Sequence, residues 1–246
     1  MGLNLVKVIF GQAPQPGANG VASRHIDCHF INICRKIVDT AEYHHSRHLT
    51  VFGALAAVNQ VCCTEGQYNQ LLRQADRVIF PGQGEARSAM EYLHQHGLVD
   101  VIRSLKQPVL GICIGQQLLC RHSEEGDVDC IGIFDVDVKR FQPQRHEDKV
   151  PCMGWNRLEV RGEKQEARGE SLEVRNLFAG LGENPYVYFV HSYYVPLCND
   201  TAAVTDYILP YSAALHKDNF YTCQFHPEKS GSVGERILRN FVELKD

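Results

Sequence analysis

The sequence predicts an α/β fold in which helices cover both faces of a mixed, mainly parallel β-sheet. The first observation is that short apolar runs, such as 77–80 and 109–112, have the length and composition of buried strands. The second is that each run leads, through a glycine-containing turn, into a stretch with helical spacing, and this alternation favours parallel strands. The third is an alternating hairpin over 212–225, which adds antiparallel strands.

Size and composition limit the classes of protein that fit. The chain has 246 residues, enough for a substantial core, and we predict a single domain over residues 1–246. Its net charge of -4 comes from interspersed acidic and basic residues, so no basic stripe is available for nucleic acid. No apolar run reaches the roughly 18 residues of a membrane span, and the opening residues lack a convincing signal peptide. Ten cysteines scattered along apolar segments indicate reduced thiols in a cytoplasmic protein.

The region before residue 76 is the least regular part of the chain. A parallel sheet needs a strand before residue 77, and either residues 6–10 or residues 51–58 could supply it. His25 and Cys28 have the spacing of zinc ligands, but no second ligand pair follows at a regular distance. We therefore expect neither a metal site nor a catalytic group over residues 11–65.

The elements after residue 76 follow in a readable order. The strand 77–80 leads through the loop 81–84 into a helix over 85–96, and Gly97 separates this helix from a second short one. The further elements expected are a strand over 109–112, a helix over 116–121 that ends at 123–126, strands from Ile131, a polar loop over 141–149, an exposed hairpin tip over 162–169, a strand over 186–190, a hairpin formed by 212–216 and 220–225, and an amphipathic helix over 235–244.

Cys113 stands where a buried strand turns directly into a helix. Gly111 and Gly115 flank it, and small residues at these positions leave room for a strained turn. The thiol would then be exposed at the carboxyl end of the sheet, where open α/β folds bind ligands. It would also lie at a helix N-terminus, which favours thiolate over thiol. Taken alone, the spacing fits a buried structural cysteine equally well.

A second motif, His226-Pro227-Glu228, follows the last predicted strand. Pro227 makes the tripeptide rigid, so that His226 and Glu228 leave the chain on the same side. A thiol nucleophile needs a base, and the base needs an acceptor that orients it. Alone, this tripeptide would be a simple turn; together with the cysteine turn it predicts a catalytic triad of Cys113, His226 and Glu228.

The stretches around the triad resemble the two signatures of class I glutamine amidotransferases. They read Gly111-Ile-Cys-Ile-Gly-Gln-Gln117 and Gln224-Phe-His-Pro-Glu-Lys-Ser230. Val150-Pro-Cys-Met-Gly-Trp-Asn156 and Phe189-Val-His-Ser-Tyr-Tyr-Val195 are similar to one branch of that family, the glutaminase subunit of imidazole glycerol phosphate synthase of histidine biosynthesis. The resemblance covers about residues 76–246. Before it, the chain is longer than the family pattern and lacks a clear Gly-Asn loop, which indicates an insertion, a divergent extension or a translation-frame error.

The resemblance implies a flavodoxin-like α/β fold and a specific reaction. Glutamine would be hydrolysed to glutamate and ammonia through a thioester on Cys113, without a cofactor or a metal. The family uses the glycine-rich loop after the first inner strand, together with the residue after the nucleophile, to bind the oxyanion. The residues implied are Gly82, Gln83, Gly84 and Ile114 for the oxyanion hole, and Gln117, Glu125, Ser192 and Tyr193 for the amino-acid end of the substrate.

The resemblance also implies a partner. In this branch the glutaminase forms a heterodimer with a (β/α)₈-barrel cyclase, which uses the ammonia to make imidazole glycerol phosphate and an aminoimidazole carboxamide ribonucleotide. Trp155, Asn156 and the Tyr193–Tyr194 edge are candidate contacts, although a lone tryptophan could equally be a core anchor. The alternatives are the glutaminase component of another class I amidotransferase, a stand-alone cysteine amidase, and a binding protein without activity.

Overall fold

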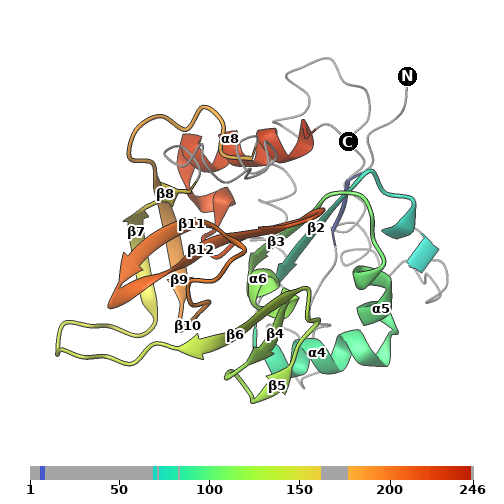
Figure 1. The fold of residues 1–246 in the computed structure, drawn as a ribbon, viewed down its shortest axis with the longest axis horizontal. Coiled ribbons are helices and arrows are strands. Elements are labelled where there is room, and N and C mark those ends of the chain that lie inside the picture. Colours follow the sequence, from blue (N-terminus) through green and yellow to red (C-terminus); the bar gives the residue numbers. More distant parts are fainter. Residues whose placement is uncertain (1–5, 9–68, 71, 83, 162–176, 245–246) are drawn as a thin grey trace, which may run out of the picture.

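The fold is built on a seven-stranded sheet with the order β1-β2-β3-β13-β12-β11-β8 (Figure 1). We analyse a computed structural model, which describes residues 6–8, 69–70, 72–82, 84–161 and 177–244. The four strands from β1 to β13 run parallel, and β12, β11 and β8 continue the sheet in antiparallel pairs. The strands are β1 (Val6–Val8), β2 (Arg77–Gly82), β3 (Val109–Cys113), β8 (Glu159–Val160), β11 (Thr201–Tyr207), β12 (Leu209–Lys217) and β13 (Phe220–Cys223).

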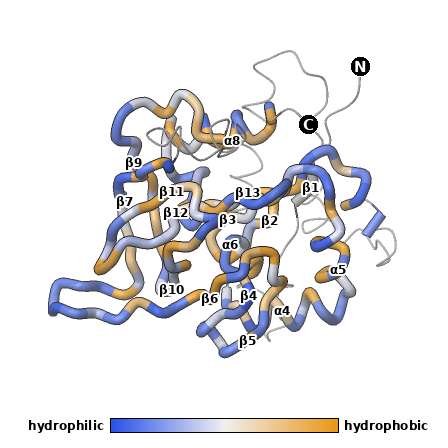
Figure 2. Tube along the Cα trace, viewed as in Figure 1, coloured by the Kyte–Doolittle hydropathy of each residue, from blue (hydrophilic) through white to orange (hydrophobic). Residues whose placement is uncertain are grey.

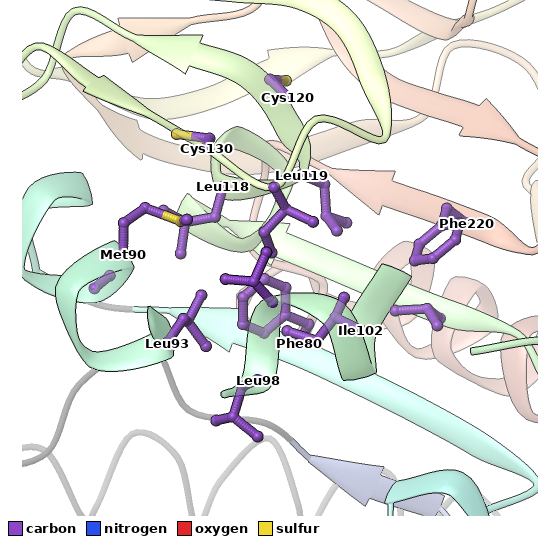
Figure 3. Close-up of a cluster of buried hydrophobic side chains, with 14 of the residues drawn as sticks. Phe80, Met90, Leu93, Leu98, Ile102, Leu118, Leu119, Cys120, Cys130 and Phe220 are labelled. Carbon is purple, nitrogen blue, oxygen red and sulfur yellow. The ribbon is translucent and has the colours of Figure 1, made fainter. Parts of the chain in front are cut away.

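Helices cover both faces of this sheet, as the sequence predicts. Successive residues of a strand point to opposite faces, so Ile79 packs on one side of β2 while Val78 and Phe80 pack on the other. The helix α8 (Gly231–Val242) covers the Ile79 face, and α4 (Ala86–Gln95) and α5 (Leu98–Arg103) cover the Phe80 face (Figure 1). Figure 3 shows the second core, in which Phe80 lies among aliphatic side chains from both of these helices.

Two smaller sheets accompany the main sheet. The first has the order β10-β6-β4-β5, and the second pairs β7 with β9. A long loop joins β6 to β7; it is hydrophilic along most of its length (Figure 2), and only Phe141 within it is buried. The strands are β4 (Cys120–Ser123), β5 (Val128–Asp129), β6 (Phe134–Arg140), β7 (Cys152–Arg157), β9 (Tyr186–His191) and β10 (Tyr193–Tyr194).

Two predicted helix boundaries are wrong. The helix α6 (Ile114–Leu119) was expected to reach Arg121, but it ends at Leu119, where the chain becomes extended and enters β4. The N–H groups of Ile131, Gly132 and Ile133 bond the carbonyls of residues 118–120, so a neighbouring segment takes over the acceptors at the helix end. At the other end of the chain, α8 begins four residues before the predicted helix. Its two early glycines are poor helix formers, and tertiary packing overrides that preference.

Among the described residues before 77, Val6–Val8 forms a strand that pairs in parallel with β2, so the first of the two predicted candidates is confirmed for these three residues. The second candidate (51–58), the predicted hairpin tip over 162–169 and the His25–Cys28 spacing lie outside the described residues. Within the described residues, no helix is both long enough and apolar enough to cross a membrane.

Candidate active site

Cys113 occupies a strained turn between β3 and α6. Its backbone has φ 56° and ψ -113°, a conformation that a residue with a side chain seldom adopts. The flanking glycines make the turn possible: a Cβ on Gly115 would lie 1.9 Å from the Phe80 carbonyl oxygen, and one on Gly111 would lie 2.9 Å from Leu119 Cδ1. Because there is no room for larger residues at positions 111 and 115, the two glycines allow the chain to make this turn, which places the Cys113 thiol at the carboxyl edge of the sheet.

His226 and Glu228 lie on the turn that follows β13. The His226 Nδ1 to Glu228 Oε1 distance is 2.7 Å, and both side chains are buried. The turn is held from two sides. The Ser230 hydroxyl donates to the His226 carbonyl at 2.7 Å, and a Cβ on Gly234 of α8 would lie 1.8 Å from the Pro227 carbonyl oxygen. Close packing of α8 thus fixes the direction of the imidazole.

Parallel pairing brings the two motifs together. β13 lies next to β3 with Cys223 opposite Ile112, so the residues that follow each strand meet at the same edge of the sheet. Burial lowers the pKa of His226, but negative charge and hydrogen bonding at Cys113 and Glu228 outweigh it and raise that pKa to about 10. The arrangement therefore favours the charged imidazolium of His226, held between Cys113 and Glu228.

A pocket of about 260 Å³ opens beside Cys113. It brings together all the described residues of the predicted oxyanion hole and substrate site; Gln83 lies outside the described residues. Gly82 stands opposite Cys113 in the β2–β3 register, and Gly84 has φ 106°, which a glycine adopts easily. The lining residues are Gly82, Gly84, Cys113, Ile114, Gln117, Glu125, Val190, His191, Ser192, Tyr193, His226 and Lys229.

The predicted substrate residues are anchored by the surrounding backbone. Gln117 Nε2 donates to the Tyr193 carbonyl at 3.0 Å, and Glu125 Oε2 accepts from the Ala86 N–H at 3.1 Å. Burial raises the pKa of Glu125, Glu85 adds to this, and the Ala86 N–H partly opposes it. Among the described residues, no group of three or more histidine, cysteine, aspartate or glutamate side chains could hold a metal ion.

Sequence analysis missed Val190, His191 and Lys229 of the pocket. His191 is buried, and burial lowers its pKa to about 4, although its hydrogen bond to the Tyr193 carbonyl works in the opposite direction. Val190 lies two residues before Ser192, and Lys229 directly follows Glu228. Adjacency to predicted site residues is therefore the signal that could have found all three.

The chain matches a known family over most of its length. The model of "Glutamine amidotransferase class-I" matches residues 37–244. The chain belongs to the class-I glutamine amidotransferase family. Its match begins inside the region that looked atypical in the sequence, so part of that region still fits the family pattern.

Relatives place the chain more narrowly within the family. It is 61% identical over 175 residues to imidazole glycerol phosphate synthase subunit HisH of Bacteroides thetaiotaomicron, a match that covers 71% of this chain and 83% of the relative. The HisH protein of Yersinia pestis is 41% identical over 172 residues, which covers 70% and 81% of the two chains. This class I amidotransferase therefore groups with the HisH proteins, the branch that its sequence resembles.

Solved structures support the fold. A Trypanosoma brucei CTPS glutaminase domain with bound acivicin superposes with a TM-score of 0.59 at 14% identity, covering 96% of this chain and 90% of that one. A putative GMP synthase component from Thermoplasma acidophilum gives 0.57 at 17% identity, covering 98% and 94%. These likenesses confirm the predicted α/β fold class.

The Trp155 side chain is 56% exposed, so it is no core anchor. It lies on the outer face of the β7–β9 pair with Met153 and Tyr186, which are 64% and 52% exposed. Asn156 points the other way and donates to the Asp206 carbonyl at 2.6 Å, while Tyr194 stacks on Phe141. Of the candidate partner contacts, Trp155 is thus the one that presents a large apolar side chain to the surroundings.

Proposed function

We propose that this amidotransferase is a glutaminase that supplies ammonia to a (β/α)₈-barrel cyclase, with which it forms imidazole glycerol phosphate synthase. The observation that carries the proposal is the meeting of the strained Cys113 turn with the buried His226–Glu228 pair at one pocket. The relatives named HisH support the assignment to this synthase over the other class I amidotransferases.

The reaction follows from the roles that the geometry allows. The Cys113 thiolate attacks the side-chain amide carbon of glutamine, and the amide oxygen becomes an oxyanion. The His226 imidazolium gives its proton to the departing nitrogen, so ammonia leaves and a thioester remains. His226, now neutral, takes a proton from water, whose oxygen attacks the thioester and releases glutamate and Cys113. Glu228 holds the imidazole tautomer and stabilises its charged form throughout.

The oxyanion is assigned to backbone donors at the carboxyl edge of β2 and β3. The N–H of Ile114 follows the nucleophile, and the Gly82–Gly84 loop stands opposite it. Backbone N–H groups aimed at a developing charge stabilise the transition state more than the ground state. Gln117, Glu125, Ser192 and Tyr193 would hold the ammonium and carboxylate groups of glutamine at the other end of the pocket.

The cyclase would dock on the outer face of the β7–β9 pair. This face continues from the exposed Met153 and Trp155 to Val190, which lines the pocket. A partner seated there would close the route from Cys113 against bulk water, where ammonia would be protonated and lost as a nucleophile. Exposed aromatic and methionine side chains are the residue types enriched at such interfaces. A cytoplasmic location stays a prediction.

Replacing the nucleophile tests the proposal. In the complex with the cyclase, Cys113→Ala should lower glutamate production by about 10⁴-fold or more, because the triad acts as one unit. The matched control is Cys198→Ala, another partly buried free cysteine, which does not line the pocket. This control should keep full activity. Substantial glutaminase activity in Cys113→Ala would refute the assignment of the nucleophile.

A further inference from the structure

The Tyr193 carbonyl organises the hydrogen bonds beneath the pocket. It accepts from His191 Nδ1 at 2.7 Å and from Gln117 Nε2 at 3.0 Å. The other ring nitrogen of His191 lies 3.0 Å from the Tyr211 hydroxyl. Because a carbonyl can only accept, both neighbours must turn N–H groups towards it. Nδ1 of His191 therefore carries a proton, burial favours the neutral ring, and the Gln117 amide has one fixed orientation.

The fixed orientation of the Gln117 amide also determines the orientation of the Gln224 amide. The Gln117 amide nitrogen also donates to Gln224 Oε1 at 2.9 Å. With its oxygen bound there, Gln224 turns its own NH₂ group to Cys113, and Gln224 Nε2 lies 3.9 Å from Cys113 Sγ. The nucleophile thus faces a permanent N–H donor whose direction is set, through two amides, by a backbone carbonyl.

Burial indicates that the Gln224 amide is more than a filler of space. The side chain is 0% exposed, and a buried amide costs free energy unless its polar atoms are bonded. An apolar side chain would pack at the same position without that cost. Two bonds distinguish glutamine from such a residue: the one its oxygen accepts from Gln117, and the N–H that this bond directs to the sulfur.

We propose that Gln224 is a further catalytic residue, which holds Cys113 Sγ in place and stabilises its negative charge, and that Gln117 positions the Gln224 amide. His226 passes protons to the departing nitrogen and from water during the reaction, whereas Gln224 donates a hydrogen bond to the sulfur without releasing its proton. The Tyr193 carbonyl that orients the amides belongs to the segment assigned to the substrate, so the same backbone group would align nucleophile and substrate. The proposal rests on the proposed glutaminase function.

Alkylation of Cys113 tests the proposal without glutamine. The full-length chain is treated with iodoacetamide over a series of pH values, and modification of the Cys113 peptide is followed by mass spectrometry. In Gln224→Met, which keeps the length but removes the donor, the alkylation rate at neutral pH should fall about tenfold and the midpoint of the rate profile should move to higher pH. The other charged or titratable groups around the pocket, Glu125, His191, Tyr193, His226, Glu228 and Lys229, stay in place.

The neighbouring Gln116 provides the matched control. It is equally buried and makes two hydrogen bonds of its own, to the Ser212 carbonyl at 3.1 Å and from the Thr222 hydroxyl at 2.7 Å. Gln116→Met loses a similar amount of buried bonding but does not touch the sulfur, so its alkylation profile should match the wild type. An unchanged profile in Gln224→Met, or the same shift in both variants, would overturn the proposal.

Two further measurements keep the test decisive. If Gln224→Met does not fold, Gln117→Met frees the Gln224 amide from its anchor and should move the profile in the same direction by a smaller amount; no movement would overturn the proposal. With the cyclase present, Gln224→Met should lower kcat about tenfold and leave KM within about twofold. Because alkylation needs no glutamine, failure of this proposal is distinguishable from failure of the proposed function.

Discussion

The Cys113 turn and the outer face of the β7–β9 pair differ in how far their residues are buried. Every residue of 114–120, just after Cys113, is buried, and Gly111 and Gly115 beside Cys113 are in close contacts that exclude a side chain. On the outer face, Met153, Trp155 and Tyr186 are all more than half exposed. The proposed reaction centre is thus closely packed within the chain, whereas an apolar surface stays exposed, which is the division expected of one half of a two-part enzyme.

The two regions meet at one side of the pocket. Trp155 makes an edge contact with Tyr188, with ring centroids 6.0 Å apart, and Lys229 Nζ lies 5.7 Å from the centroid of the Tyr188 ring. Lys229 lines the pocket and follows Glu228 directly. The exposed face is therefore continuous with the triad.

The largest loss of stability should come from adding a methyl group to the closely packed Cys113 turn. Gly115→Ala places a Cβ 1.9 Å from the Phe80 carbonyl oxygen, a backbone atom that cannot turn aside. We expect the free energy of unfolding, measured in urea, to fall by about 3 kcal/mol, and glutaminase activity to fall with it. Gly182→Ala is the control, since among the described residues other than its chain neighbours no atom lies within 4 Å of the added Cβ, and only its φ of 74° is unfavourable. A loss of about 1 kcal/mol is expected there. Equal losses would show that the turn is not closely packed.

Lowering the pH should reduce the free energy of unfolding through His191, which is buried at the pocket beside Cys113. Its pKa falls from about 6.5 in the unfolded chain to about 4 in the folded protein, because burial disfavours the charged ring. Between these values the unfolded chain binds more protons, so stability decreases as pH falls from about 6.5 to 4, by about 2–3 kcal/mol. His226 adds little in this window, because its raised pKa keeps it protonated in the folded state, and below about 6.5 it is mostly protonated in the unfolded chain as well.

The variant His191→Asn isolates this contribution. Urea unfolding at several pH values should show a shallower loss of stability in the variant than in the wild type between pH 6.5 and 4. Parallel curves would mean that His191 is not buried as a neutral ring.

The smallest effect on the stability of the isolated chain is expected from a substitution on the exposed outer face of the β7–β9 pair. Trp155→Ala removes an exposed side chain, so the free energy of unfolding should change by less than about 0.5 kcal/mol. Affinity for the cyclase, measured by titration calorimetry, should fall about tenfold, because aromatic residues carry much of the binding energy at interfaces. Leu197→Ala, an exposed apolar residue on neither β7 nor β9, is the control and should bind normally. Undiminished affinity in Trp155→Ala would place the interface elsewhere.

Local chemistry explains which features could be predicted from the sequence. The elbow at Cys113 and the His226–Glu228 pair could be predicted because glycine and proline impose backbone geometry within a few residues of the reactive groups. The helix predicted over 85–96, found at 86–95, was recognised by apolar residues at helical spacing, and its end by Gly97, which has φ 61°. Buried strands were recognised by short apolar runs, as in β3.

Features set by distant contacts could not be predicted. The end of α6 depends on carbonyls being taken over by residues 131–133, which no local pattern records. The start of α8 depends on Gly234 packing against Pro227. In β7, the exposed Met153 and Trp155 alternate with Cys152 and Asn156, which face inward. Because both faces of this strand carry apolar residues, the sequence pattern does not indicate which face is exposed. The Gln117–Gln224 bond joins residues far apart in the sequence, so only the folded chain shows it.

The central claim is that this chain contains the reaction centre, whereas the cyclase controls its activity by docking on the exposed outer face of the β7–β9 pair. The most direct test measures glutamate production by the chain alone, with the cyclase, and with the cyclase and its nucleotide substrate. We expect weak hydrolysis by the chain alone and stimulation by about tenfold or more when cyclase and nucleotide are both present, a coupling of ordinary size between two sites. Full activity of the isolated chain, unchanged by either addition, would contradict the claim and identify a stand-alone amidase.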